Sequence, residues 1–218
     1  MNPRPLSVLL LLLSAALLAQ TPVPAPAPQT YSSDIGFTYS LPADWEVVEV
    51  APSMQAAQQQ AANNASTEDA KKGMACAQMV LTAHHGTPPS VVAVVALPFD
   101  CFGQQMTEKD LPSVAAGASE GINKNFDISG PTYGAYSLGT HSVWIERATG
   151  SVIGHPEINR TVETVCSILK KGAACWLMLA ADDVALQTFE HSSVMLDGEA
   201  PTALVPATAF DKKPTSGF

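Results

Sequence analysis

Four cysteines are the residues of this chain with the greatest capacity for chemistry. Cys76, Cys101, Cys166 and Cys175 are separated by gaps of 25, 65 and 9 residues. A cysteine nucleophile needs a histidine held beside it, and a zinc site needs closer ligand spacing, such as C-x2-C or H-x3-H. The chain shows no local signature of either kind. The four cysteines therefore predict two disulfides, for which three connectivities are open.

The hairpin predicted around the lysine pair 170–171 narrows the connectivity. A two- or four-residue loop places Cys166 opposite Cys175, at a Cα separation of roughly 4.5–5.5 Å that suits a disulfide. A three-residue loop with Gly172 in the left-handed conformation shifts the register by one and puts the two sulfurs on opposite faces. Cys76 and Cys101 start and end a second predicted hairpin and form the second expected disulfide. Their positions are offset by about two residues from direct pairing in that hairpin.

The histidines are the next candidates for chemistry, and two of them are adjacent. His84 and His85 sit at the end of a predicted strand, where neighbouring side chains point to opposite faces. Surface histidines at a turn and a metal-ligand pair are both open interpretations, but no metal or cofactor is predicted. A hydrolase is a further alternative, which requires a pocket where His141 or His155 meets two acids. The common hydrolase and nucleotide-binding motifs are absent, so no catalytic residue is predicted and enzymatic activity is uncertain, with a non-enzyme preferred.

Charged residues alternate along two successive predicted strands and provide the candidate partner surface. Cross-strand ion pairs on a solvated face explain most of them. Trp144 is either an exposed aromatic anchor, of the type enriched at binding hot spots, or a core residue. If the protein binds a partner, the expected surface consists of Trp144, Glu146, Arg147 and Arg160.

The elements that must position these residues begin behind an export signal. In residues 1–20, Arg4 is the only charge before an apolar run that ends at Ala19, where we expect cleavage. The run is shorter than the ~20 apolar residues of a membrane span; a retained signal anchor is the alternative. No stable membrane span is expected after signal cleavage. The net charge of −9 argues against nucleic acid as a partner.

Composition divides the remainder into three parts. Residues 21–30 alternate proline and alanine, which is typical of an extended linker. Residues 31–196 form the predicted single domain, and residues 197–218 are predicted to be a disordered C-terminal tail. Hydrophobic periodicity predicts strands at 37–41, 45–50, 76–84, 91–97, 131–138, 142–149, 158–169 and 174–180, and helices at 54–72, 108–126 and 183–192. Short connections predict an α+β fold with a mostly antiparallel sheet flanked by helices.

The first predicted strand carries the one family resemblance. Gly36-Phe37-Thr38-Tyr39-Ser40-Leu41-Pro42-Ala43-Asp44-Trp45 fits the pattern G-F-x-[FY]-S-[LF]-P-x-x-W directly after an export signal. This opening resembles the PsbP-like fold, shared by the photosynthetic PsbP proteins, the periplasmic DcrB proteins and the mycobacterial LpqN lipoproteins. The order of elements extends the resemblance over 31–196. It implies a binding or assembly factor rather than an enzyme, and it carries over no catalytic residue.

The sequence therefore predicts a secreted or periplasmic, disulfide-bonded domain that acts as a non-enzymatic binding or assembly factor of the cell envelope. Its expected partner is an envelope or extracellular protein. A small-ligand carrier is the alternative, which requires an apolar cavity between the helix at 108–126 and the sheet.

Overall fold

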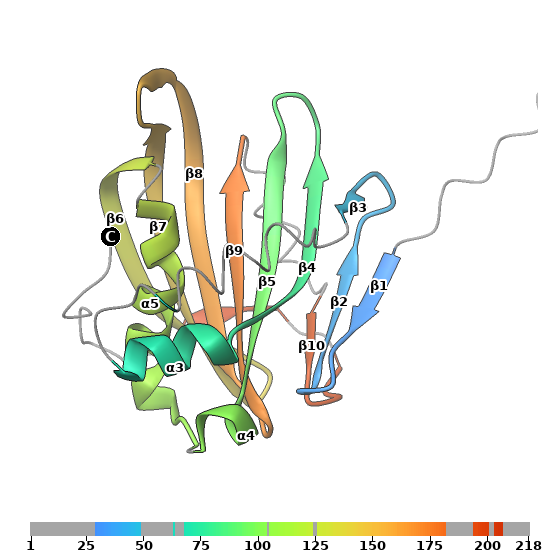
Figure 1. Cartoon of the computed structure of the whole chain (residues 1–218). Helices are drawn as coiled ribbons and strands as arrows, with labels where there is room; N and C mark the ends of the chain where they lie inside the picture. Colours follow the sequence, from blue (N-terminus) through green and yellow to red (C-terminus); the bar gives the residue numbers. More distant parts are fainter. Residues whose placement is uncertain are drawn as a thin grey trace, which may run out of the picture.

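The structure is a computed structural model that describes residues 29–48, 63, 68–103, 105–123, 126–181, 194–200 and 203–206 (Figure 1). The predicted signal peptide, residues 21–28 of the linker and the helix expected at 183–192 lie outside the described residues. So do most of the helix expected at 54–72 and residues 207–218 of the expected tail. Among the described residues, no helix has the length and apolar character needed to cross a membrane.

Antiparallel strands dominate the fold, as the sequence predicts. The strands are β1 (Gln29–Ser32), β2 (Phe37–Leu41), β3 (Glu46–Val48), β4 (Gln78–His85), β5 (Ser90–Pro98), β6 (Phe126–Leu138), β7 (His141–Val152), β8 (His155–Ile168), β9 (Gly172–Ala180), β10 (Val194–Leu196) and β11 (Val205–Pro206). An eight-stranded sheet has the order β11-β6-β7-β8-β9-β5-β4-β3, and a three-stranded sheet has the order β1-β2-β10. Each of these pairings is antiparallel.

The three-stranded sheet packs against one face of the large sheet. Alternation along β2 buries Phe37, Tyr39 and Leu41, which share a core with apolar residues of β4, β5, β7, β8 and β9. Trp176 of β9 lies at the centre of this core, with ring centroids 5.2 Å from Phe37 and 6.4 Å from Tyr39. The opening residues that carry the family resemblance are therefore core residues.

A helix covers the opposite face of the large sheet. The 3-10 helix η1 (Glu108–Asp110) leads into α5 (Leu111–Asn123), and Thr107 and Asp110 form the capping box that the sequence predicts. α5 packs on β6, β7, β8 and β9, in front of the sheet in Figure 1. Its buried residues Leu111 and Ala115 fill the space against Trp144 and the disulfide of β8 and β9. Among the described elements, α5 thus covers one face of the large sheet, and the three-stranded sheet packs against the other.

Two short helices carry the first disulfide. α3 (Glu68–Cys76) packs against α4 (Phe99–Phe102), and the bridge between Cys76 and Cys101 joins them. The helix expected to end at residue 72 continues through Gly73 to Cys76, and the strand expected from residue 76 begins at Gln78. The glycine lies inside α3, where an added Cβ would be 3.9 Å from the Phe102 ring, so its small size suits the close approach of the two helices.

The folded region exceeds the predicted 31–196 range at both ends. Gln29 and Thr30, assigned to the linker, pair with Leu41 and Ser40 of β2. Residues 197–200 and 203–206, assigned to the tail, contact the sheet, and β11 pairs with β6. Backbone pairing decides these ends, and the Pro/Ala-rich and Pro-containing compositions did not indicate it.

Candidate functional site

Both predicted disulfides are present in the structure. Cys76 and Cys101 have Cα atoms 5.6 Å apart, and Cys166 and Cys175 have Cα atoms 4.2 Å apart. The second bridge follows the register predicted for a two-residue loop, because Cys166 lies directly opposite Cys175 and Leu169 N–H donates to the Gly172 carbonyl. All four thiols are therefore bonded, and no cysteine is free for catalysis.

The predicted partner surface does not exist as one surface. Trp144 and Glu146 are 1% and 0% exposed, so the core interpretation of Trp144 is correct. The two residues are separated by two positions on β7 and point to the face that α5 covers. Arg147 points to the opposite face, and Arg160, on β8, donates to the Asn159 carbonyl. The strand period explains the error, because alternating charges need not share a solvated face.

Glu146 is a buried carboxylate with two described side-chain donors. Trp144 Nε1 donates to it at 3.2 Å, and Ser119 Oγ of α5 donates at 3.4 Å. Desolvation raises the pKa of Glu146, while these two hydrogen bonds lower it in part. The Tyr133 ring stacks on Trp144, with the two ring centroids 6.5 Å apart. Glu146 therefore joins α5 to β7 in a closed polar contact beneath the helix.

Arg147 and Glu163 form an ion pair on the other face. They are direct partners across β7 and β8, and the Arg147 guanidinium donates from Nε and Nη2 to Glu163 Oε2. Glu163 is fully buried, whereas 42% of the Arg147 side chain is exposed. The buried carboxylate fixes the arginine in place, because a carboxylate buried without its partner costs several kcal/mol.

Arg147 lines a groove of about 420 Å³ that we call the β6 groove. Its floor is formed by β6 and β7, with Tyr136 and Ile145 as apolar contacts. Leu204 and its neighbours in residues 203–206 form one wall. A Cβ at Gly134 would lie 2.7 Å from the Tyr136 ring, so a side chain at this position would displace that ring. No pattern in the sequence indicated this groove, because one of its walls falls in the expected tail.

The adjacent histidines do not share a ligand. His84 Nε2 lies 3.7 Å from Glu46 Oε2. His85 Nδ1 lies 3.5 Å from Asp44 Oδ2, and the His85 ring stacks on Trp45. Both lie at the end of β4, as the surface interpretation predicts. Among the described residues, no set of three or more histidine, cysteine and acidic side chains has the arrangement of a metal site.

His141 meets two acids, which is the combination that the hydrolase alternative requires. Its Nε2 lies 3.6 Å from Asp197 Oδ2 and 3.5 Å from Glu199 Oε1, and its Nδ1 lies 3.3 Å from the Ile168 carbonyl oxygen. The side chain is only 12% exposed, and Nε2 has no contact with solvent. A general base must reach its substrate with one ring nitrogen. Here both nitrogens face protein oxygens, so the geometry is that of an ion-pair cluster.

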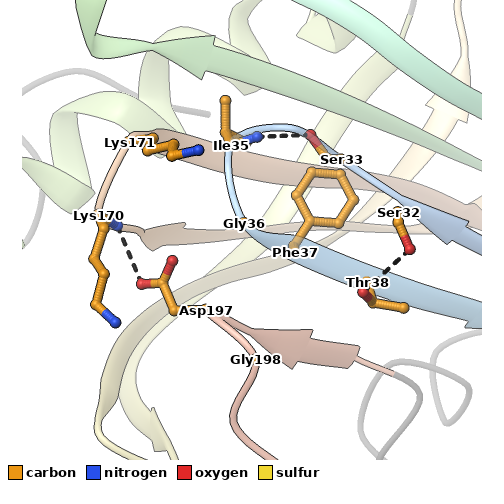
Figure 2. A pocket seen from close by; sticks show the side chains of 10 residues that line it. All are labelled: Ser32, Ser33, Ile35, Gly36, Phe37, Thr38, Lys170, Lys171, Asp197 and Gly198. Atoms are coloured by element: carbon orange, nitrogen blue, oxygen red, sulfur yellow. Dashed lines mark hydrogen bonds between the residues drawn. The ribbon is translucent and has the colours of Figure 1, made fainter.

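Asp197 also borders a second pocket, of about 330 Å³, between three turns of the chain. Figure 2 shows its carboxylate beside the backbone of Lys170, whose N–H donates to Oδ2 at 3.1 Å. The Asp197 N–H donates to the Gly36 carbonyl at 2.6 Å. Gly36 has a φ of 116°, and a Cβ there would lie 2.5 Å from Asp197 Oδ1. Asp197, 6% exposed, thus fastens the β1–β2 and β8–β9 turns to the end of β10.

Comparisons with known proteins concern the fold alone. A scan against protein-family models finds no match, and a search of curated proteins finds none. The chain is similar to the solution structure of cyanobacterial PsbP (CyanoP) from Synechocystis sp. PCC 6803, with 13% identity, a TM-score of 0.44, and coverage of 80% of this chain and 95% of that one. It is also similar to LpqN of Mycobacterium tuberculosis, described as involved in cell envelope biogenesis, with 13% identity, a TM-score of 0.41, and coverage of 83% and 91%. These matches agree with the PsbP-like resemblance predicted from the opening residues.

Proposed function

We propose that this protein is an exported, non-enzymatic binding factor of the cell envelope or extracellular space that holds an extended segment of a partner protein in the β6 groove. The observation that carries the proposal is the groove itself, which places a fixed arginine beside aromatic and aliphatic side chains at the edge of a large sheet. Arginine and tyrosine are the residue types enriched at protein-binding hot spots.

The edge strand provides the backbone part of the site. β11 pairs with only two residues of β6, Ser137 and Tyr136. Over 126–135, β6 has β7 on one side and no described strand on the other. A strand edge of this kind can accept an extended peptide, with main-chain hydrogen bonds providing affinity. The short β11 shows that this edge already accepts an added strand.

Side chains of the groove provide the specificity. Tyr136 and Ile145 offer an apolar surface, and Arg147 offers a partly exposed guanidinium whose position is fixed by Glu163. We expect a bound segment with an apolar residue over Tyr136 and a polar or acidic group at Arg147. Two disulfides support an oxidising compartment, where such bonds persist, and agree with the predicted export signal.

The test is site-specific photo-crosslinking in the native organism. A photoreactive residue replaces Thr132, which lies in the groove, and a control chain carries it at Glu157, an exposed site on β8. We expect one partner protein to crosslink from position 132 and not from 157, with the crosslink mapped to a single extended segment. Crosslinking that is equal from both positions, or absent from 132, would overturn the proposal.

A small-ligand carrier is the second candidate, favoured by the groove volume. About 420 Å³ lies within the ~300–1,000 Å³ usual for ligand sites. The predicted cavity beneath the helix is not its location, because Leu111, Ala115 and Trp144 pack closely there. Native mass spectrometry of the purified protein distinguishes the candidates. A bound small molecule that is lost in Gly134→Ala, which displaces Tyr136, and kept in Gly117→Ala, which has open space at Cβ, would favour the carrier.

A further inference from the structure

We propose that the pocket between the β1–β2 turn, the β8–β9 turn and the end of β10 binds a phosphodiester group, with Lys170 and Lys171 as its charge partners. We call it the turn pocket, and its volume is about 330 Å³. The turn pocket and the β6 groove share no lining residue. The inference therefore goes beyond the proposed function and does not depend on it.

The turn pocket reverses the charge of the protein locally. The chain carries 20 acidic residues against 11 lysines and arginines, yet two adjacent lysines line this pocket. The Lys170 ammonium has no hydrogen bond or ion pair with another described residue. Lys171 Nζ donates to the Asp34 carbonyl oxygen at 3.5 Å. Because an ammonium has three donors, both lysines can still donate to an anion, toward which lysine acts as a point charge.

The carboxylate of Asp197, which also lines the pocket, is bonded to the protein. Its side chain is 6% exposed, and Oδ2 accepts from the Lys170 backbone N–H at 3.1 Å. Oδ1 lies against Gly36, where a Cβ would be 2.5 Å away. The charge of Lys170 also acts on Glu199, which is held by Thr140. Two lysines and one aspartate give the lining a net charge of +1, which matches the single negative charge of a phosphodiester.

Hydroxyl groups of the β1–β2 hairpin add donors to the pocket. Ser33 Oγ accepts from the Ile35 N–H at 3.4 Å, so its own O–H is available to donate. The hydroxyls of Ser32 and Thr38 lie 3.3 Å apart, and a bond between them uses only one of their two protons. Phosphodiester oxygens only accept hydrogen bonds, whereas a cationic ligand would leave these donors without an acceptor.

Hydrogen bonds between distant segments fix the walls of the pocket. The Asp197 N–H donates to the Gly36 carbonyl at 2.6 Å, and the Phe99 N–H donates to the Lys171 carbonyl at 3.0 Å. In Figure 2 the Lys171 side chain points across the pocket toward the β1–β2 turn, while the Lys170 side chain runs beside Asp197. A pocket that is already formed binds without the cost of ordering its walls.

Buried apolar residues form the floor. Ile35 and Phe37 are 6% and 1% exposed. Lysines at a hairpin tip are ordinarily surrounded by water, but a charge beside a low-dielectric core attracts an anion more strongly. The volume lies at the lower end of the ~300–1,000 Å³ usual for ligand sites, so it suits a small headgroup.

Two probes with the same phosphodiester test the proposal and distinguish its sources. Glycerophosphoglycerol is soluble, and its binding is followed by NMR titration of the full mature chain at constant ionic strength. We expect amide shifts at 32–38, 170–171 and 197–198, and none at 132–136 in the β6 groove. Vesicles of phosphatidylglycerol present the same group on a lipid surface, and co-sedimentation is compared with phosphatidylcholine vesicles. Binding of the soluble probe indicates a free phosphodiester, and binding confined to vesicles indicates a lipid headgroup; either result supports the site.

Charge variants locate the binding. Lys170→Gln and Lys171→Gln should each weaken binding about 10-fold, because each removes a hydrogen bond to a charged group. Both side chains are exposed, so the variants should fold. Lys171→Arg, which keeps the charge, should retain binding.

Arg160→Gln is the matched control, because it removes one positive charge from β8 ten residues before Lys170. At the rise of a strand this is roughly 30 Å away, several times the Debye length of about 8 Å. It should bind as the wild type does. Failure of both probes to bind, amide shifts outside the turn pocket, or an equal loss in Arg160→Gln would overturn the inference.

Discussion

Gly172 at the start of β9 offers a quantitative test of how the sheet is packed. A Cβ built there would lie 2.7 Å from the Leu97 carbonyl oxygen and 3.2 Å from Pro98 Cα. Both contacts are backbone atoms of β5, the strand that pairs with β9 at this point. A side chain could rotate away from such a contact, but a backbone held in the ladder cannot. We predict that Gly172→Ala destabilises the protein.

The magnitude follows from two opposing terms. Overpacking a close contact costs ~1–3 kcal/mol, and replacing glycine by alanine recovers about 0.4–1 kcal/mol through the lower entropy of the unfolded chain. The two ranges give a net loss of about 0–2.6 kcal/mol, and their midpoints give a loss of about 1.3 kcal/mol. For a domain of this size, each kcal/mol changes Tm by about 2–4 °C, so we expect Tm to fall by roughly 3–5 °C.

Gly117→Ala is the matched control, since the substitution is the same and the surroundings differ. Gly117 lies in α5 and has no heavy atom within 4 Å of an added Cβ. The better helix propensity of alanine should raise stability by ~0.5–1 kcal/mol. Urea and thermal unfolding followed by circular dichroism measure both variants. A Gly172→Ala protein as stable as the wild type would refute the packing argument. A destabilised Gly117→Ala would show that the space around an added Cβ does not decide whether the substitution stabilises or destabilises the protein.

The remaining predictions concern pH and the disulfides. Burial raises the pKa of Glu146, so the folded state binds the carboxyl proton more tightly than the unfolded state does. The contribution of Glu146 to the free energy of unfolding therefore falls as pH rises from its pKa in the unfolded state through its raised pKa in the folded state. Glu146→Gln should therefore gain stability relative to the wild type between pH 4 and 8; a constant difference in urea unfolding would contradict this. The bridge between Cys76 and Cys101 spans 25 residues, so loop entropy predicts that the double variant Cys76→Ala/Cys101→Ala loses about 3.5 kcal/mol in the free energy of unfolding. The bridge between Cys166 and Cys175 spans 9 residues, and the corresponding loss for Cys166→Ala/Cys175→Ala is about 2.6 kcal/mol. A larger loss for the second pair in urea unfolding would mean that packing beneath α5 outweighs loop entropy.

Local pattern in the sequence determined the antiparallel strands and the disulfides. Alternation over 37–41 predicted the buried face of β2, because a strand with one buried face must repeat every two residues. The lysine pair 170–171 between two strand patterns predicted the hairpin, and the two-residue loop that the structure has is one of the alternatives that place Cys166 opposite Cys175. The resemblance to PsbP-like proteins rests on the same opening residues.

Only the tertiary structure decided which side of a strand meets a helix. Trp144, Glu146 and Arg147 belong to one charged segment, yet α5 buries the first two and the groove receives the third. The sequence contains the two-residue period but not the identity of the layer on each face. For this reason the predicted partner surface was wrong although its strand was right.

Long-range contacts also decided both candidate sites. His141 and Glu199 are 58 residues apart and meet because the β6–β7 turn and the end of β10 lie at the same end of the fold. The groove wall at 203–206 has no apolar periodicity, so composition alone assigned it to a tail. A two-residue strand acquires its structure from the edge with which it pairs, and that edge exists only once the large sheet has formed.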